Sequence, residues 1–187
     1  KEAARRMGAA FRENVDMPDG FFQNNPENVQ KVIRILRWCR PQIVLGNAPH
    51  DRHPDHGRAS QLIYAACFYA GLAKIETTRN DGTPQEKWRP ENLYYYIQDY
   101  NLEPDFVIDI SSTIEQKMEV IKAFRSQFHV PDASEYAQEA QTPISGSDFM
   151  AFLKAKARTY GRAAGYEFGE GFVASRVLGV GDLFALD

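Results

Sequence analysis

The feature that most constrains the fold is a short apolar run followed directly by a polar loop and a helix start. Residues 42–46 are apolar and β-branched at their centre, which predicts a strand buried on both faces of a parallel sheet. Pro54 favours an extended residue before it and a helix after it, so we expect His53 at the helix entrance, with Asp55 and His56 in the first turn. Ligands usually bind beyond the carboxyl ends of such strands, and the loop between residue 46 and Pro54 lies at such an end.

Helix and strand patterns alternate along the rest of the chain. Capping residues and apolar spacing predict helices over about 26–39, 54–70 with Gly71 as its stop, 112–128 with a Ser112/Glu115 capping box, and 147–162. Strands are predicted over 93–98 and 106–110, and loops over 80–84 and 131–146. This alternation predicts an α/β fold with a parallel sheet covered on both faces.

Length and composition fit one compact domain over residues 1–187, since 43% of the residues are hydrophobic. The chain opens at Lys1 with a stretch that is typical of the last turns of a helix ended by Gly8. We therefore expect a longer protein whose N-terminal segment the chain lacks.

The charge and apolar patterns exclude two classes of partner. A net charge of −3 gives no general attraction to nucleic acid or anionic membranes. The longest apolar run, residues 62–73, falls short of the roughly twenty residues that cross a bilayer. Cys39 and Cys67 both lie in helical patterns, which indicates inert core thiols in a reducing compartment and predicts a cytoplasmic protein.

Residues 50–56 hold three of the four histidines of the chain and two aspartates. Neutral imidazole and carboxylate are ligands for zinc and related divalent ions, and together they also move protons near neutral pH. The segment is therefore a candidate metal and acid/base site. The alternative is a polar loop in which Asp and His are present because they cap helices and tolerate turns.

The chain resembles the LmbE/PIG-L family of zinc-dependent N-deacetylases, and most closely its bacillithiol-biosynthesis branch. His53-Pro54-Asp55-His56 is the specific part of the resemblance. Weaker matches run along most of the chain, at residues 17–19, 62–74, 107–111, 126–128 and 169–172. The resemblance implies a Rossmann-like three-layer sandwich with a mostly parallel sheet, here lacking its N-terminal strand-helix portion.

The resemblance also implies a zinc ion held by three protein ligands. His56 corresponds to the third ligand, whereas the motif that carries the other two ligands and a general-base aspartate has no counterpart in this sequence. His53 is then expected to donate a proton to the oxyanion or the leaving nitrogen, with Asp55 as its orienting partner. His50 is left outside the site as a loop histidine. Iron, cobalt or manganese would also suit such ligands.

Substrate contacts are predicted less specifically. Arg52 and Arg58 flank the site and are candidates for a substrate carboxylate, although they also fit ion-paired surface residues. Trp88 and Tyr94 to Tyr96 suit stacking on a sugar, but aromatic residues in a strand are first of all packing residues.

Glu170, in the Gly-Glu-Gly-Phe element, corresponds to a carboxylate near the family active site. Phe168 and Phe149 stand where related enzymes often have tyrosines, so a tyrosine-dependent substrate gate is in doubt and Tyr166 is a possible substitute.

The resulting hypothesis is a hydrolase that removes an acetyl group from an N-acetylglucosamine conjugate and releases acetate and a free amine. N-acetylglucosaminyl malate, on the route to bacillithiol, is the expected substrate, and a homohexamer is the expected assembly by resemblance. Two alternatives stay open: an amidase of another sugar or thiol conjugate, and a non-catalytic sugar-binding module.

Overall fold

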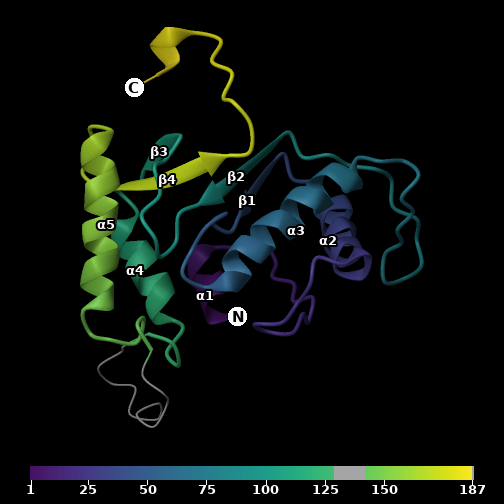
Figure 1. Ribbon diagram of the computed structural model, residues 1–187, viewed down its shortest axis with the longest axis horizontal. Helices are drawn as coiled ribbons and strands as arrows, with labels where there is room; N and C mark the ends of the chain where they lie inside the picture. The colour runs from purple at the N-terminus through teal and green to yellow at the C-terminus, as the bar shows by residue number, and fades with distance from the viewer. Residues whose placement is uncertain (129–141, 187) are drawn as a thin grey trace. The chain divides into compact units, whose positions relative to one another are not determined.

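The computed structural model describes residues 1–128 and 142–186, which form two compact units (Figure 1). Unit 1 comprises residues 1–14 and 107–170, and unit 2 comprises residues 15–106 and 171–187. The elements, in chain order, are α1 (Glu2–Met7), α2 (Pro26–Cys39), β1 (Ile43–Gly46), α3 (Pro54–Ala70), β2 (Asn92–Tyr96), β3 (Phe106–Asp109), α4 (Ile114–Lys122), α5 (Phe149–Ala163), β4 (Gly169–Ala174) and η2 (Leu183–Ala185). The single domain over residues 1–187 stays a prediction.

Unit 2 is built on helices α2 and α3, which pack against each other. Asn25 caps α2 by accepting a hydrogen bond from the Asn28 N–H at 2.9 Å, and α3 ends at Gly71 as expected. The core consists of buried side chains from both helices and from β2: Val29, Ile33, Leu36, Leu62, Ala66, Cys67, Ala70, Leu93 and Tyr95. The predicted bounds of both helices are confirmed.

The sheet is mixed, with the strand order β1-β2-β4-β3. Strands β1 and β2 are parallel, with Leu45 opposite Tyr94, whereas β2 and β4 are antiparallel, with Tyr95 opposite Val173. The expectation of a mostly parallel sheet is therefore corrected. Its cause is β4, a strand that the sequence patterns did not predict and that runs opposite to β2.

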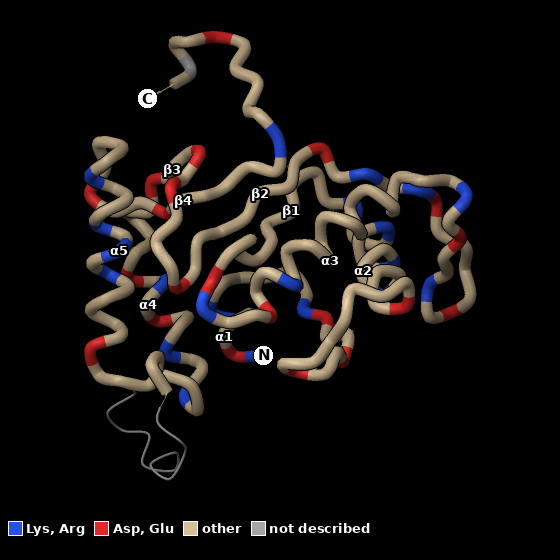
Figure 2. The backbone as a smooth tube through the Cα atoms, viewed as in Figure 1, with Lys and Arg blue, Asp and Glu red and all other residues tan. Residues whose placement is uncertain are grey.

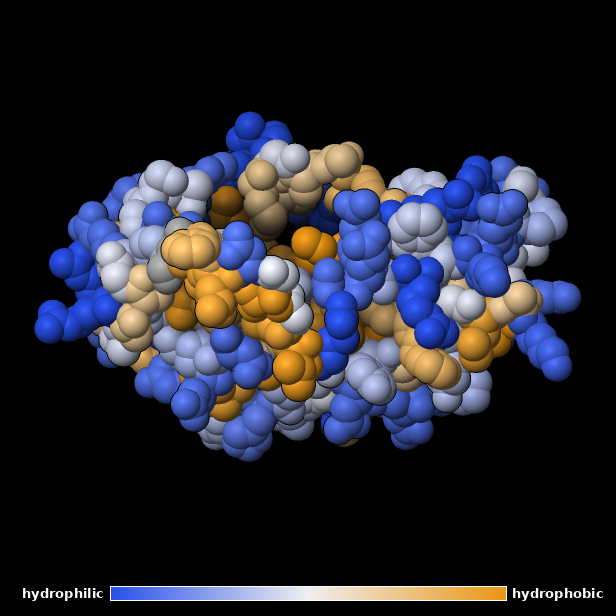
Figure 3. Space-filling view, turned by 90° about the horizontal axis from the view of Figure 1, so that it is seen from above, coloured by the Kyte–Doolittle hydropathy of each residue, from blue (hydrophilic) through white to orange (hydrophobic). Residues whose placement is uncertain are grey.

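Strand β1 is an edge strand whose outer face is open. Alternate residues of a strand point to opposite faces. Ile43 and Leu45 are each 54% exposed, whereas a Cβ on Gly46 would meet the rings of Tyr95 and the side chain of Ile63 in α3. In unit 2, the helices therefore cover only one face of β1. The predicted burial of this strand on both faces is not observed, and the described residues of unit 2 do not form a three-layer sandwich. More generally, Figure 3 shows patches of hydrophobic residues (orange) among hydrophilic ones on the surface seen from above.

Unit 1 is mainly helical and has its own small core. Its buried side chains are Ile110, Ile114, Met118 and Ala157. Helix α1 contacts α4, and Arg6 Nη1 donates to the Glu119 carbonyl oxygen at 2.8 Å. Helix α5 comes so close to the start of β4 that a Cβ on Gly161 would lie 2.7 Å from the Phe168 backbone. This close approach explains a glycine inside a helix.

Two predicted features of unit 1 differ from the structure. Helix α4 follows Thr113, whose side chain makes no capping hydrogen bond, and it ends at Lys122 instead of Phe128. The Ser112/Glu115 capping box does not form: Thr113 is the N-cap residue, which makes Glu115 the second helical residue, and the Glu115 carboxylate pairs with Lys154. By contrast, α1 ends as predicted at Gly8, which has a φ of 75°. The predicted 131–146 loop lies largely outside the described residues.

The membrane and cysteine predictions can also be compared with the structure. None of the described helices is long and apolar enough to cross a bilayer. Cys39 and Cys67 are both free, and burial raises the pKa of the Cys39 thiol and raises that of Cys67 to about 11. Both thiols are therefore poor nucleophiles near neutral pH, as expected for core cysteines.

Candidate active site

The histidine loop lies at the carboxyl ends of two adjacent parallel strands. It follows β1 directly, and the segment 98–100 follows β2. Because parallel strands end at the same edge of a sheet, these two segments meet there. This is the position that the sequence pattern predicted for a ligand-binding loop.

His53 stands at the entrance of α3, as predicted. It is the N-cap residue, and its Nδ1 accepts a hydrogen bond from the Asp55 backbone N–H at 3.2 Å. Because Nδ1 accepts in this arrangement, the ring proton is on Nε2. This contact leaves Nε2 as the ring nitrogen of His53 that can donate to a ligand.

The carboxylate of Asp55 has other partners than the His53 ring. It accepts a hydrogen bond from the Gly20 N–H at 2.7 Å, and it forms an ion pair with Arg58. Arg58 Nη1 also donates to the Gly20 carbonyl oxygen at 3.2 Å. The predicted orientation of His53 by the Asp55 carboxylate is thus corrected: Asp55 and Arg58 hold the turn at Gly20 against the start of α3.

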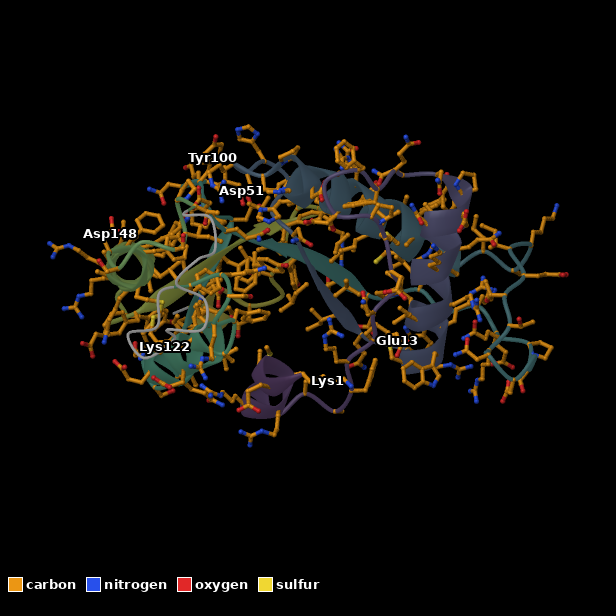
Figure 4. All side chains as sticks on the ribbon, turned by 90° about the horizontal axis from the view of Figure 1, so that it is seen from below. Lys1, Glu13, Asp51, Tyr100, Lys122 and Asp148 are labelled. Carbon is orange, nitrogen blue, oxygen red and sulfur yellow. The ribbon has the colours of Figure 1, made fainter. Side chains whose placement is uncertain are left out.

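His56 is oriented by Asp51, which lies in the candidate segment 50–56 but had no predicted role of its own. His56 Nδ1 lies 2.5 Å from Asp51 Oδ2, and the side chain of Asp51 is only 1% exposed. Asp51 Oδ1 also accepts the backbone N–H groups of Asp99 at 3.1 Å and Tyr100 at 2.8 Å. Figure 4 shows Asp51 and Tyr100 side by side. One buried carboxylate therefore joins the loops that follow β1 and β2.

The electrostatics of Asp51 follow from these contacts. Burial raises the pKa of its carboxyl group, but the hydrogen bonds from the Tyr100 N–H, from His56 and from the Arg52 and Asp99 N–H groups outweigh it. The pKa of Asp51 consequently lies below its ordinary value. Asp51 is thus an anion near neutral pH, and its carboxylate accepts a hydrogen bond from His56 Nδ1–H.

Gln98, two residues after the end of β2, faces His56. Its Oε1 accepts from Asn47 Nδ2 at 3.1 Å and from the Ala48 N–H at 3.3 Å. Its Nε2 lies 3.3 Å from His56 Nε2. His56 Nε2 therefore carries the lone pair of the ring, and the rings of His53 and His56 lie with their centroids 5.4 Å apart.

The other predicted site residues are ion-paired. Arg52 pairs with Asp99 at 3.1 Å, so both arginines that flank the site have carboxylate partners. Glu170 belongs to unit 1 and pairs there with Lys117 at 2.8 Å. The roles of Arg52, Arg58 and Glu170 in substrate binding stay predictions.

The nearby aromatic residues and His50 mostly have packing roles. Tyr95 is part of the unit 2 core, where burial raises the pKa of its hydroxyl to about 12, and Tyr94 packs against Phe106. Trp88 donates its indole N–H to the Pro41 carbonyl oxygen at 2.9 Å. His50 lies against Tyr100 with ring centroids 5.4 Å apart, outside the His53 and His56 pair.

The residues of the site supply only part of the ligand set that a zinc ion requires. His56 has the arrangement of a metal ligand, because a carboxylate fixes one ring nitrogen and leaves a lone pair on the other. A structural or catalytic zinc site, however, takes at least three protein ligands. The described part of the chain contains no group of three or more His, Cys, Asp or Glu residues that could hold a metal ion. These residues alone do not fit a complete zinc site.

The fold and the site together define an α/β protein with a histidine–carboxylate cluster at the carboxyl ends of two parallel strands. Residues 1–67 match the PIG-L family model, which is described as GlcNAc-PI de-N-acetylase. The conserved protein TT1542 from Thermus thermophilus is 34% identical, with a TM-score of 0.78, and the match covers 96% of this chain and 72% of that one. The chain belongs to the PIG-L family.

Two relatives have names that report an activity. The chain is 27% identical to a diacetylchitobiose deacetylase from Thermococcus kodakarensis, over 91% of its own length and 59% of that protein. It is 26% identical to an N,N'-diacetylchitobiose deacetylase from Pyrococcus horikoshii, with a TM-score of 0.72 and coverage of 92% and 60% of the two chains. The chain thus spans about three fifths of the length of these deacetylases.

A third solved structure shares the fold alone. GalB, a 4-carboxy-2-hydroxymuconate hydratase from Pseudomonas putida KT2440, is 18% identical, with a TM-score of 0.71 and coverage of 97% of this chain and 71% of that one. The fold therefore carries different chemistries, and the function has to be argued from the site.

Proposed function

We propose that this protein is a hydrolase that removes the acetyl group from an N-acetylated amino sugar, giving acetate and a free amine. The observation that carries the proposal is the pair of oriented imidazoles, His53 and His56, at the carboxyl ends of β1 and β2 in a member of the PIG-L family. The names of the family model and of the two deacetylase relatives support an N-acetyl sugar as the substrate class.

The finer proposal concerns the substrate and the assembly. N-acetylglucosaminyl malate, an intermediate on the route to bacillithiol, is the substrate that we propose from the sequence resemblance. A homohexamer is proposed on the same ground, and a cytoplasmic location is proposed from the two free core cysteines. Light scattering on the purified protein measures the assembly, and a monomer at micromolar concentration would contradict it.

The side chains have distinct proposed roles. His53 has its Nδ1 engaged by the Asp55 backbone N–H, so Nε2–H is the group that donates a hydrogen bond to the oxyanion. Transfer of a proton to the leaving nitrogen requires the imidazolium form of His53. His56 is proposed as one ligand of a divalent metal, zinc by resemblance, with Asp51 fixing its tautomer. The described residues do not complete a metal site, so the proposed roles are limited to side chains of this chain.

The test compares two histidine variants in an acetate-release assay with N-acetylglucosaminyl malate, N,N'-diacetylchitobiose and N-acetylglucosamine. His53→Ala should lower turnover on the order of 100-fold or more without changing the metal content of the protein. His56→Ala should reduce both turnover and bound metal. His50→Ala is the matched control and should change neither. Equal turnover in His53→Ala and the unsubstituted protein would contradict the assignment of the proton donor.

A non-catalytic sugar-binding module is the second candidate, and one observation favours it: the described residues contain no three-ligand metal group. Calorimetry separates the two candidates. A sugar-binding module binds N-acetylglucosamine and releases no acetate from any of the three compounds. A deacetylase of another conjugate, in contrast, would release acetate only from a broader panel of N-acetyl amines.

A further inference from the structure

Among the described residues, Gln98 is the hydrogen-bond donor that lies next to His56 Nε2, the ring nitrogen that Asp51 does not contact. Its orientation follows from its other contacts. The Oε1 atom faces two donors, Asn47 Nδ2 and the Ala48 N–H, at 3.1 and 3.3 Å. A flipped amide would place its NH2 group against both donors, so the carboxamide is fixed with Nε2 toward His56.

The contact between Gln98 and His56 is long. Asp51 accepts a hydrogen bond from His56 Nδ1–H, so His56 Nε2 accepts from Gln98 Nε2 at 3.3 Å. Hydrogen bonds from N–H donors are usually about 2.9 to 3.0 Å long. The hydrogen bonds to Gln98 Oε1 thus hold the Gln98 NH2 group in place. The long hydrogen bond from this group to His56 is weak, so a better acceptor on a ligand can replace His56.

We propose that Gln98 donates a hydrogen bond to the carbonyl oxygen of the substrate acetyl group, and that this bond strengthens as the oxygen becomes negative. The inference rests on the proposed deacetylase function. A fixed amide donor needs little reorganisation when charge develops on the oxygen, which is the property of an oxyanion-hole donor. Gln98 also discriminates between the acetylated sugar and the free amino sugar, since the amino sugar has no acetyl carbonyl to accept its N–H.

Two substitutions at Gln98 separate this role from a structural one. Gln98→Glu keeps an oxygen that accepts from Asn47 and Ala48 but removes the N–H donor, whereas Gln98→Leu removes both. Both variants should lower kcat on the order of 100-fold with a smaller change in KM. A merely structural Gln98 predicts loss in Gln98→Leu alone, together with a lower melting temperature. Gln42→Glu makes the same chemical change at an exposed glutamine before β1 and should leave kcat unchanged.

Nuclear magnetic resonance tests the contact without turnover. The side-chain NH2 signals of Gln98, assigned by their loss in Gln98→Glu, should shift when N-acetylglucosamine is added at millimolar concentration and should not shift with glucosamine. Unchanged signals, or equal shifts with both sugars, would overturn the inference. Full kcat in Gln98→Glu would also overturn it while leaving the deacetylase proposal intact. Absence of acetate release from the unsubstituted protein counts against the deacetylase function, and the signal shifts still decide whether Gln98 binds an acetyl carbonyl.

Discussion

The histidine loop of unit 2 and the surface of unit 1 use charged residues in opposite ways. In unit 1, the pairs Arg5–Glu2, Lys154–Glu115 and Arg158–Glu167 have side chains that are 44–75% exposed. In unit 2, the Asp51 side chain is 1% exposed and accepts three hydrogen bonds. Figure 2 shows Lys and Arg (blue) and Asp and Glu (red) interspersed on many of the described segments. Burial, and not the density of charge, therefore marks the candidate site.

This contrast predicts its largest effect at Asp51. Asp51→Ala leaves two backbone N–H groups and the His56 ring without their acceptor, which should cost about 3 kcal/mol of unfolding free energy. Urea unfolding followed by tryptophan fluorescence measures this value, because Trp38 and Trp88 both belong to unit 2.

The control for Asp51→Ala is an exposed carboxylate of the same unit. Glu86→Ala removes the partner of Arg40, and the Glu86 side chain is 84% exposed. Its effect should stay within about 0.5 kcal/mol. Equal losses in the two variants would remove the contrast between buried and exposed carboxylates.

The dependence of stability on pH gives a smaller effect with a defined sign. The pKa of Asp51 is lowered in the folded protein, below the unfolded value of about 3.9. Its contribution to stability is therefore fully present above that pH and is lost as the pH falls through the lower folded-state pKa. Asp51→Asn should flatten the acid limb of a curve of unfolding free energy against pH. If the unfolding free energy of the variant falls with the same slope at acidic pH as that of the unsubstituted protein, groups other than Asp51 determine the acid limb.

The smallest effect is expected for the half-buried ion pair of unit 1. Lys117 and Glu170 have side chains that are 33% and 29% exposed and lie 2.8 Å apart. A double-mutant cycle with Lys117→Met and Glu170→Gln should give a coupling energy of about 0.5–1 kcal/mol, measured by circular dichroism during thermal unfolding. A coupling near 3 kcal/mol would place this pair in the same energetic class as the Asp51 contacts.

The elements that could be predicted from the sequence are those fixed by neighbouring residues. Asn25-Pro26 and His53-Pro54 mark the starts of α2 and α3, and Gly71 follows the last residue of α3. These signals act within one turn of a helix, so a single sequence contains them completely. Strand β4 has no such local signal, and its antiparallel pairing with β2 is decided by residues far away in the chain.

The site was predictable to the same extent. The positions of His53 and His56 follow from Pro54, but the partners of the site carboxylates do not. Asp55 is two residues from His53, yet its carboxylate accepts from Gly20, which is 35 residues earlier. The position of Gln98 could be predicted in part. It is the last residue of the predicted 93–98 strand, and the carboxyl ends of neighbouring parallel strands lie side by side.

Helix α3 is anchored at both of its ends. At its start, Asp55 and Arg58 bind the turn at Gly20, and at its end the buried Arg37 donates to the carbonyl oxygens of Ala70 and Leu72 at 3.0 and 2.9 Å. The backbone that carries both imidazoles cannot slide along its own axis without breaking one of these sets. Since Asp51 and Gln98 also link the 47–52 and 98–100 loops by hydrogen bonds, both imidazoles stand on a backbone that is preorganised before any ligand binds.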